Sequence, residues 1–516
     1  MNRDLLLALD NGTQSVRALL FDARGELVGK SRVPLDDYIV SAPGRHEHDP
    51  EGFWQSLALA CRKLFEQDAS FAHRVAGVAL TTQRGTVVNL DRTGRPLRPA
   101  ITWLDQRKST AIPALPLRWR IVFGLVGAGE TIRYFQQEAE ANWIAQHEPT
   151  LWERTDKYVL LSGYLLYRLT GEYIDSVGAQ VGYLPFDFNK MAWAKPGDWK
   201  WDALPIRPSM LPRLLDPGTV GGEVREAAAS ATGIPRGTPV IMAAADKACE
   251  VLGAGCIAPA VAALSYGTTA TVNALSHRYI EATRFVPPYP AAVPHAYTTE
   301  VQIFRGYWMV NWFKEQFGYI EQMAARESGR PVESYFDELV ESVPPGSMGL
   351  MLQPYWTPGI RMPEAKGAIV GFGDIHTRAH LYRAMLEGLA FALRDGLNRI
   401  EKRSGVRVTS LRVAGGGSQS DAALQLTADL FGLPTARPHV YETSGLGAAI
   451  DAAVGLGFHR DFPTAVGEMT RTARTFEPDR TTHALYDELY ISVYQRLYGR
   501  LAPLYRAIRR ITGYPS

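Results

Sequence analysis

The sequence has little cysteine, no long hydrophobic run and almost no net charge. Its three cysteines, Cys61, Cys249 and Cys256, are odd in number and lack the spacing of a metal site, which favours a reducing compartment and a cytoplasmic protein. No segment reaches the roughly 18 uncharged apolar residues of a membrane span. Asp4 and Asp10 interrupt the first apolar run, so we expect no signal peptide. The formal net charge of +2 creates no overall field toward nucleic acid or an anionic membrane, and we expect neither as a partner.

The sequence does contain enough apolar material for two globular domains. Of its 516 residues, 46% are hydrophobic and 21% are charged, which excludes a disordered chain, and this length exceeds what one core supports. Segments typical of strands alternate with a segment typical of a helix in the first half, and such alternation predicts an α/β fold. The expected strands are Leu5–Leu9, Val16–Phe21, Val75–Thr81 and Thr86–Leu90, and the expected helix is Pro50–Phe65.

One local basic cluster departs from the even charge balance. Arg506, Arg509 and Arg510 lie within five consecutive residues, together with Ala507 and Ile508. Clusters of this kind usually form the solvated face of a helix, and we expect the same here.

The turn between the first two expected strands has an unusual composition. An Asn-Gly turn between apolar strands is an ordinary hairpin, but residues 10–15, Asp-Asn-Gly-Thr-Gln-Ser, add a carboxylate and two hydroxyls. Residues 262–275, AALSYGTTATVNAL, repeat the arrangement with Gly267, Thr268 and Thr269 in the turn. The echo indicates two domains of like fold, each with one such loop. Chance similarity between two common hairpins is the alternative.

A third segment combines a strand, a glycine run and a helix. Within residues 411–434, Gly415–Gly417 follow an apolar strand and precede a helix predicted over Asp421–Phe431, which Gly432 and Pro434 end. Backbone N–H groups in such a turn can approach a nucleotide closely. The segment lacks both the Gly-Lys-Ser/Thr of a Walker A loop and the spaced glycines of a dinucleotide fingerprint, so alone it is weak evidence.

Asp246 follows an expected buried strand and precedes a helix, within residues 240–255, VIMAAADKACEVLGAG. An aspartate at this place can simply cap the helix. It can also act as a general base, because ligands of α/β proteins bind at the carboxyl edge of the sheet.

These segments together resemble the FGGY family of carbohydrate kinases, and the resemblance covers nearly the whole chain. Residues 367–387 resemble the family's C-terminal signature, except that Phe372 replaces a smaller aliphatic residue. Four further motifs occur in family order: residues 9–22 resemble the first phosphate loop, residues 243–255 the catalytic-aspartate segment, residues 264–272 the second phosphate loop and residues 414–434 the adenosine-binding segment.

The resemblance implies an α/β fold of two ribonuclease-H-like domains, the actin-like ATPase fold, around a central cleft. We expect an N-terminal domain at residues 1–256 and a C-terminal domain at residues 257–516. It also implies transfer of phosphate from ATP, with Mg²⁺, to a hydroxyl of a sugar or polyol. Asp246 would accept the proton of the attacking hydroxyl, and Asp10, through water, and Asp246 would face the metal. The implied nucleotide-binding residues are Asn11, Gly12, Thr13, Gln14, Gly267, Thr268, Thr269, Gly415, Gly416, Gly417 and Gln419.

The implied substrate residues lie in a turn and beside the expected base. Residues 81–107 resemble the family hairpin whose turn touches the sugar, so Gln83 and Arg84 are candidates, against the alternative of a solvent-exposed turn. Lys247 is a further candidate, or else a structural partner of neighbouring carboxylates. Tyr134 lies near the place where glycerol kinases use a tyrosine.

Other polar residues of the first half receive structural interpretations. Trp103, Asp105 and Arg107 match a Trp-x-Asp-x-Arg pattern, for which we expect an internal ion pair that supports the hairpin. We expect His46 and His48 to be solvated loop residues and not metal ligands.

The turn Gln83-Arg84-Gly85 differs from two branches of the family. Glycerol kinases carry Gln-Arg-Glu there, and xylulose kinases carry Met-His-Gly. The absence of the glutamate removes an acceptor for two hydroxyls of glycerol, and Gly85 leaves space for a larger substrate. We expect a ketopentose such as xylulose. Glycerol, another polyol and a sugar acid are the alternatives, the last because Arg84 and Lys247 are both cations.

Functions outside this class are a filament protein, a chaperone ATPase, a sugar-sensing repressor or a catalytically inactive ATP-binding relative. A first strand at Leu5 leaves no room for DNA-binding helices, and a chaperone needs a further peptide-binding domain. Asp246 beside a hydroxyl pocket favours an enzyme. The sequence does not decide whether the protein forms a homodimer.

Overall fold

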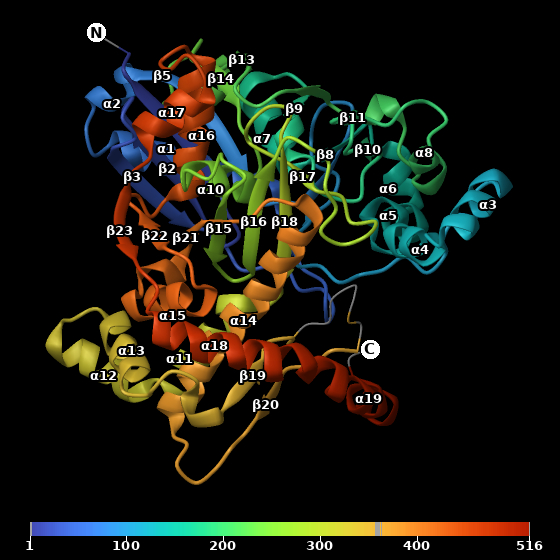
Figure 1. Cartoon of the computed structure of the whole chain (residues 1–516). Coiled ribbons are helices and arrows are strands. Elements are labelled where there is room, and N and C mark those ends of the chain that lie inside the picture. The colour runs from blue at the N-terminus through green and yellow to red at the C-terminus, as the bar shows by residue number, and fades with distance from the viewer. Residues whose placement is uncertain (1–2, 357–361, 363, 515–516) are drawn as a thin grey trace. The chain divides into compact units, whose positions relative to one another are not determined.

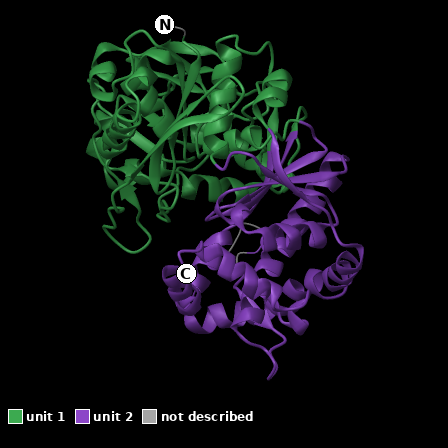
Figure 2. Cartoon of the chain, turned by 90° about the vertical axis from the view of Figure 1, so that its left-hand side faces the viewer, with its two compact units in different colours: residues 1–257, 276–298, 442–470 green, residues 258–275, 299–441, 471–516 purple. Residues whose placement is uncertain are grey.

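The structure, a computed structural model, describes residues 3–356, 362 and 364–514 (Figure 1). It divides into two compact units (Figure 2). Unit 1 is Met1–Ile257, Ser276–Thr298 and Glu442–Thr470, and unit 2 is Ala258–Leu275, Thr299–Tyr441 and Arg471–Ser516. The change after Ile257 lies beside the division expected from the sequence. The sequence led us to expect one division, between residues 256 and 257, which would place residues 276–298 and 442–470 in the C-terminal domain. In the structure these two segments belong to unit 1.

Unit 1 is built on a six-stranded sheet in the order β13-β14-β5-β1-β2-β3. β1 pairs antiparallel with β2 and parallel with β5, and β5 pairs parallel with β14. The carboxyl ends of three parallel strands therefore share one edge of the sheet. The strands are β1 (Leu5–Asn11), β2 (Ser15–Phe21), β3 (Leu27–Pro34), β5 (Val75–Thr82), β13 (Val220–Glu223) and β14 (Pro239–Met242).

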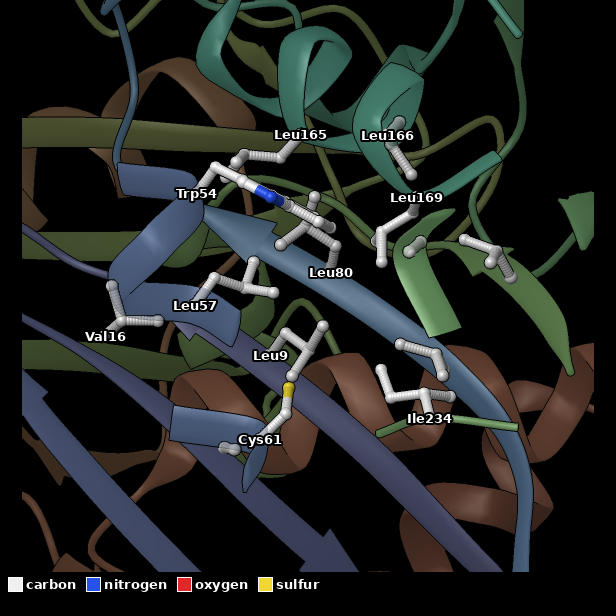
Figure 3. Packing of buried hydrophobic residues seen from close by; sticks show 14 of the residues in the cluster. Leu9, Val16, Trp54, Leu57, Cys61, Leu80, Leu165, Leu166, Leu169 and Ile234 are labelled. Atoms are coloured by element: carbon white, nitrogen blue, oxygen red, sulfur yellow. The ribbon is translucent and has the colours of Figure 1, made fainter. Parts of the chain in front are cut away.

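The core of unit 1 explains why the expected elements form where they do. Helix α1 (Pro50–Phe65) begins at Asp49, whose carboxylate accepts a hydrogen bond from the Glu51 N–H at 3.0 Å. Its apolar residues at helical spacing, including Trp54 and Leu57, pack with Leu9 of β1 (Figure 3). Because β1 is buried along its whole length, its residues Leu5–Leu9 are consecutive apolar residues instead of an alternating pattern, and only Asp10 and Asn11 at its end are polar.

Two helices of unit 1 touch through glycines. α10 (Asp246–Gly253) packs on α16 (Thr443–Gly455), which also packs on β1 and β5. A Cβ on Gly253 would lie 2.0 Å from the Thr443 carbonyl oxygen, and a Cβ on Gly447 would lie 1.9 Å from the Cys249 carbonyl oxygen. The two backbones are therefore in direct contact, and no side chain fits between them.

Unit 1 also contains a second, four-stranded sheet in the order β4-β7-β6-β8.

The five elements expected from the sequence are confirmed, as β1, β2, β5, β6 and α1, with ends shifted by at most two residues. The remaining strands are β4 (Glu47–His48), β6 (Val87–Leu90), β7 (Ala100–Ile101), β8 (Lys157–Leu160), β9 (Ile174–Ser176), β10 (Phe186–Asp187), β11 (Ala192–Trp193) and β12 (Arg213–Leu215). The remaining helices are α2 (Ser70–Arg74), α3 (Leu117–Val126), α4 (Gly129–Glu138), α5 (Glu140–His147), α6 (Pro149–Arg154), α7 (Leu161–Thr170), α8 (Trp199–Ala203), α9 (Glu226–Thr232) and α17 (Phe462–Met469).

Unit 2 repeats the strand pairing of unit 1. Its strands have the order β18-β16-β15-β21-β22-β23. β15 pairs antiparallel with β16 and parallel with β21, and β21 pairs parallel with β22, as β1 pairs with β2 and β5, and β5 with β14. The echo between the two hairpin sequences therefore reflects two domains of like topology. The strands are β15 (Val261–Tyr266), β16 (Ala270–Ser276), β18 (Tyr297–Ile303), β21 (Ser410–Ala414), β22 (Thr435–Pro438) and β23 (Thr472–Phe476), with β19 (Met351–Gln353) and β20 (Ala368–Val370) forming a separate pair. The short strand β17 (Tyr289–Pro290) falls within the unit 1 segment 276–298.

The helices of unit 2 include α15, whose bounds are those predicted from the sequence. The helices are α11 (Gly306–Phe317), α12 (Tyr319–Ser328), α13 (Val332–Glu341), α14 (Arg378–Ser404), α15 (Asp421–Phe431), α18 (Arg480–Leu489) and α19 (Gln495–Thr512), with a π-helix at Tyr490–Tyr494 before α19.

Among the described residues, none of the helices combines the length and the apolar character that crossing a lipid bilayer requires.

Candidate active site

Three segments meet at the carboxyl edge of the unit 1 sheet. The turn after β1 contains Asn11 and Gly12, the turn after β5 begins at Gln83, and the loop after β14 leads through Ala244 to α10. The Gln83 N–H donates to the Asn11 carbonyl at 2.9 Å, and its side-chain amide donates to the Gly12 carbonyl at 3.3 Å. The Thr81 hydroxyl donates to the Ala244 carbonyl at 2.9 Å. The structure thus brings together the sequence-predicted residues of these three segments.

Asp10 lies buried at this edge and pairs with Arg17. The two residues are cross-strand neighbours in the β1–β2 hairpin, and Arg17 Nη1 lies 2.8 Å from Asp10 Oδ2. Burial raises the pKa of Asp10 to about 6, with Arg17 opposing the shift and the charges of Asp246 and Glu442 adding to it. Arg17 Nε also lies 3.4 Å from Glu442 Oε2. Sequence reasoning missed Arg17, although it is the single charged residue of β2.

Asp246 is the first residue of α10 and not its cap. The cap position is Ala245, so the capping alternative is wrong. The Asp246 carboxylate accepts a hydrogen bond from the Lys247 N–H at 2.7 Å and remains partly exposed. Burial raises the pKa of Asp246, while Arg84 and Lys247 oppose this shift and Glu250 adds to it. A carboxylate with a raised pKa is a stronger proton acceptor, which suits a general base.

Lys247 has a structural partner on the next turn of α10. Its Nζ lies 3.2 Å from Glu250 Oε2. This ion pair is the kind of contact expected if Lys247 has a structural role, and it offsets part of the positive charge of Lys247.

The first loop combines occupied and unpaired polar groups. The Gly12 N–H donates to the Ser15 carbonyl at 3.1 Å, and the Thr13 hydroxyl accepts from Trp103 Nε1 at 3.2 Å. Both side-chain amide atoms of Asn11 are buried with no hydrogen-bond partner in the described part of the chain. A Cβ on Gly12 would find its nearest neighbour at 3.4 Å, so packing alone does not require glycine there. These features fit a polar ligand that approaches the turn. Gln14, the next residue, is exposed.

The second loop, in unit 2, turns its N–H groups away from a helix. The carbonyls of Gly267 and Thr268 accept from the N–H groups of Tyr307 at 3.1 Å and Trp308 at 3.4 Å, at the start of α11. Because each peptide is planar and trans, the N–H groups of Thr268 and Thr269 point the opposite way. They have the orientation of donors to an anion, and the Thr268 side chain is exposed.

The glycine run of unit 2 contains two structural glycines and one that borders open space. Gly415 has a φ of +83°, and a Cβ on it would lie 2.9 Å from the Tyr266 carbonyl carbon. A Cβ on Gly417 would lie 2.1 Å from the Tyr307 ring. A Cβ on Gly416 would meet only the Tyr441 hydroxyl, at 3.5 Å. Gly416 is therefore the position at which a ligand can approach the backbone. Gln419, at the end of this turn, is exposed.

The turn Gln83-Arg84-Gly85, the candidate substrate turn, is more buried than a solvent-exposed turn would be. Gln83 is 3% exposed, which excludes a solvated side chain there. The Arg84 guanidinium lies 5.0 Å from the centre of the Tyr289 ring. Tyr134 hydrogen-bonds Tyr183 and also interacts with Tyr289, and burial raises the pKa of Tyr134 to about 12. Tyr183 and Tyr289 were missed because they lie far from the turn in sequence and belong to no recognised motif.

The Trp-x-Asp-x-Arg pattern forms the expected internal ion pair. Arg107 Nε lies 2.7 Å from Asp105 Oδ1, and Arg107 Nη2 lies 2.9 Å from Glu47 Oε1. All three side chains are nearly inaccessible. The pair anchors the segment that carries Trp103, whose indole holds Thr13 of the first loop.

The expectation for His48 is wrong. His48 is buried, stacks on Phe53 with ring centres 4.3 Å apart, and has Nδ1 3.1 Å from the Asp49 carbonyl. His46 is half-buried. Tertiary packing of α1 against the loop causes this burial. Within the described ranges, no group of three or more His, Cys, Asp or Glu side chains could hold a metal ion.

Both halves of the chain match known protein domains. Residues 5–253 match the N-terminal domain of the FGGY family of carbohydrate kinases, and residues 262–456 match its C-terminal domain. A xylulose kinase of Staphylococcus epidermidis is 28% identical over 530 residues, which cover 99% of this chain and 100% of that protein. A glycerol kinase of Dechloromonas aromatica is 30% identical over 488 residues, 92% of this chain and 93% of that protein.

The solved structure of a xylulose kinase from Rhodospirillum rubrum matches with a TM-score of 0.81 and 26% identity, and covers 97% of this chain and 100% of its own. A gluconate kinase from Lactobacillus acidophilus has the same fold, with a TM-score of 0.81 at 21% identity over 98% of this chain and 99% of its own. The chain belongs to the FGGY family of carbohydrate kinases and has its two-domain α/β fold of the actin-like ATPase class.

Proposed function

We propose that this kinase transfers the γ-phosphoryl group of ATP to a hydroxyl of a ketopentose such as xylulose. The kinase class follows from the family. The observation that carries the proposal is the sheet edge of unit 1, where Asp246, with its raised pKa, lies near Arg84 and beside an open turn.

Asp246 is the proposed general base. Its carboxylate, at the first residue of α10, is partly exposed, while the Lys247 N–H fixes its orientation. It would take the proton of the substrate hydroxyl as that oxygen attacks the phosphorus in line. Before this proton transfer, the positive charge of Arg84 would stabilise the ionised Asp246 carboxylate. Arg84 would also help to orient the sugar.

The nucleotide would be held by the loops of both units. We assign phosphate contacts to Asn11, Thr13 and Gln14, with Gly12 providing space and not its N–H, which Ser15 already binds. Thr268 and Thr269 would donate to phosphate from the second loop after Gly267. The adenosine would lie against Gly416, with Gln419 near it and with Gly415 and Gly417 shaping the turn.

The donor set fits Mg²⁺ as a partly hydrated ion. Asp10 and Asp246 interact electrostatically, so two carboxylates lie near one point. Mg²⁺ keeps several waters and is usually completed by substrate phosphates, which is consistent with the lack of a larger cluster of ligands among the described residues. When bound, the ion would neutralise phosphate charge. Asp10 would hold it through water, and Arg17 would hold Asp10.

The size of the substrate follows from the turn at Gly85. A Cβ there would meet only Trp103 Cβ at 3.7 Å and the Val181 carbonyl at 3.9 Å, so space is open beside Arg84. A small triol would leave this space unfilled, whereas a ketopentose can occupy it. A sugar acid is disfavoured because Glu250 already balances the charge of Lys247.

The test is ADP release measured side by side on glycerol, xylulose, ribulose, erythritol and a sugar acid. We expect the highest kcat/KM on a ketopentose. Glycerol as the best substrate would contradict the argument from Gly85. A second arm uses Gly85→Asn, because asparagine tolerates the φ of +65° at this position. This variant should lose activity on the ketopentose while ATP hydrolysis without sugar is unchanged.

A further inference from the structure

Helix α19 has an unusual charge composition. Its 18 residues, Gln495–Thr512, contain five arginines and no acidic residue. In the part of the chain that the structure describes, one of these arginines has a carboxylate partner: Arg506 Nη1 lies 2.9 Å from Glu364 Oε1. The other four, Arg496, Arg500, Arg509 and Arg510, are exposed and form no ion pair within the described ranges. The expected solvated basic face is thus present, and it extends beyond the cluster at its end.

The same helix exposes a line of aliphatic side chains. Leu504, Ile508 and Ile511 are 58%, 43% and 76% exposed. Their spacing of four and three residues places them on one side of the helix. The other side is packed, since Ala502 and Tyr505 are buried and the Tyr505 hydroxyl donates to Gln353 Oε1 at 2.8 Å.

Arginines continue this exposed line. Arg500 precedes Leu504 by four residues, and Arg496 precedes Arg500 by four more, so both lie on the same side of the helix. Arg510 precedes Ile511 by one residue and flanks this line about 100° further around the helix. At about 1.5 Å per residue the helix spans roughly 27 Å. Its outer side therefore presents positive charge at one end and aliphatic groups with flanking arginines at the other.

We propose that α19 docks the protein on the surface of an anionic lipid bilayer, lying in the plane of the interface. Basic amphipathic helices bind there through apolar insertion and attraction to anionic headgroups. The long arginine side chains can extend to the headgroups while the aliphatic line is inserted. The net charge of the whole chain predicts no such partner, but local charge decides binding over a Debye length of about 8 Å. The two matched family domains span residues 5–253 and 262–456, and α19 lies outside both.

A lipid surface fits this side of α19 better than a protein does. In a symmetric contact with a second copy, the arginines would face identical arginines, which is repulsive. Protein interfaces rely on large anchors, above all aromatic ones, that fill shaped pockets, whereas the apolar line here contains only the aliphatic side chains Leu504, Ile508 and Ile511. A bilayer needs no shaped complement.

The experiment is sedimentation of the full chain with vesicles of phosphatidylcholine and phosphatidylglycerol in equal parts, and with phosphatidylcholine alone. We expect binding to the anionic vesicles at low salt and its loss at high salt. The variant Arg496→Gln, Arg500→Gln, Arg510→Gln should weaken binding by about 100-fold, since each cation near an anionic surface contributes about fivefold. The variant Leu504→Ser, Ile508→Ser, Ile511→Ser should also bind less, and both should keep normal kinase activity.

A matched control changes another exposed apolar line. Leu117, Ile121 and Leu125 of α3 are 67%, 54% and 83% exposed, and their change to serine should leave vesicle binding intact. Three results would overturn the proposal: equal binding to neutral vesicles, no binding at low salt, or loss of binding in the α3 variant. A change in oligomeric state of the α19 serine variant without any vesicle binding would indicate a second copy as the occupant, and would also overturn it. None of these results bears on the substrate proposed above.

Discussion

The contact between α10 and α16 makes Gly447→Ala an informative perturbation of Asp246, the proposed general base. Gly447 lies on α16, and a Cβ there would be 1.9 Å from the Cys249 carbonyl oxygen of α10. Asp246 begins the same helix, one turn before Cys249. The substitution therefore acts on the proposed base without touching it.

The size of the effect follows from this distance. Ordinary contact begins near 3.4 Å, so α10 must move away from α16 by about 1.5 Å, the difference between 3.4 and 1.9 Å. A misplacement of about 1 Å can cost about 100-fold in rate. Overpacking of a tight contact costs about 1–3 kcal/mol of the free energy of unfolding. We expect kcat to fall by about 10- to 100-fold, with a smaller change in the KM for ATP.

The assay is steady-state ADP release together with thermal unfolding. Gly467→Ala in α17 is the matched control, because a Cβ there has no atom within 4 Å. It should leave kcat unchanged and stabilise the helix slightly, by up to about 1 kcal/mol. Gly253→Ala tests the same contact from α10, since its Cβ would lie 2.0 Å from the Thr443 carbonyl oxygen. Normal kcat and normal stability in both contact variants would refute the close approach of the two helices.

Three further predictions concern the charged and hydroxyl groups of the site. Asp246→Asn should lower sugar-dependent ADP formation by about 100-fold or more with ATP binding retained; near-normal turnover would exclude Asp246 as the base. The pKa of Asp10 rises from 3.8 in the unfolded chain to about 6 on folding, so its ionisation destabilises the native state as pH rises through this range, by about 3 kcal/mol. The stability of Asp10→Asn relative to the natural chain should therefore increase as the pH rises from 3.8 to 6, as measured by thermal unfolding at several pH values. If the stability difference between the two proteins does not change with pH, the pKa of Asp10 is not raised. Thr13→Val and Thr268→Val should each raise the KM for ATP with little effect on sugar binding, and an ATP-analogue complex with both hydroxyls beyond hydrogen-bond reach would show that they do not bind phosphate.

The fold was predictable where one strand or helix carries its own signal. β1 and β2 are mostly apolar and almost entirely buried, apart from the polar residues near their shared turn, and α1 has both a capping aspartate and helical spacing. The similarity between the β1–β2 and β15–β16 hairpins could be recognised from the sequences of their turns alone. The return of residues 276–298 and 442–470 to unit 1 was not predictable, since it depends on tertiary contacts such as the approach of Gly447 to Cys249.

The site was predictable at the level of segments and less so at the level of atoms. Asp10 lies at the end of β1, and Gln83 and Asp246 come after β5 and β14. The parallel pairing of these strands brings their ends together, so the proximity of the three residues follows from strand order. Arg17 and Glu442 were missed because an ion pair between distant segments leaves no local pattern. His48 was misjudged for a similar reason, since Phe53 buries it from a neighbouring element.

The glycines of the site show why residue type alone does not determine a role. In the run Gly415–Gly417, two glycines are required by neighbours of the same unit and only Gly416 borders open space. At Gly85, by contrast, the positive φ favours glycine and the surroundings are also open, so both causes act together. A substitution that satisfies the backbone but fills the space separates them. Asparagine at position 85 is therefore a sharper test of substrate size than alanine, which would strain the turn and reduce activity whatever the substrate.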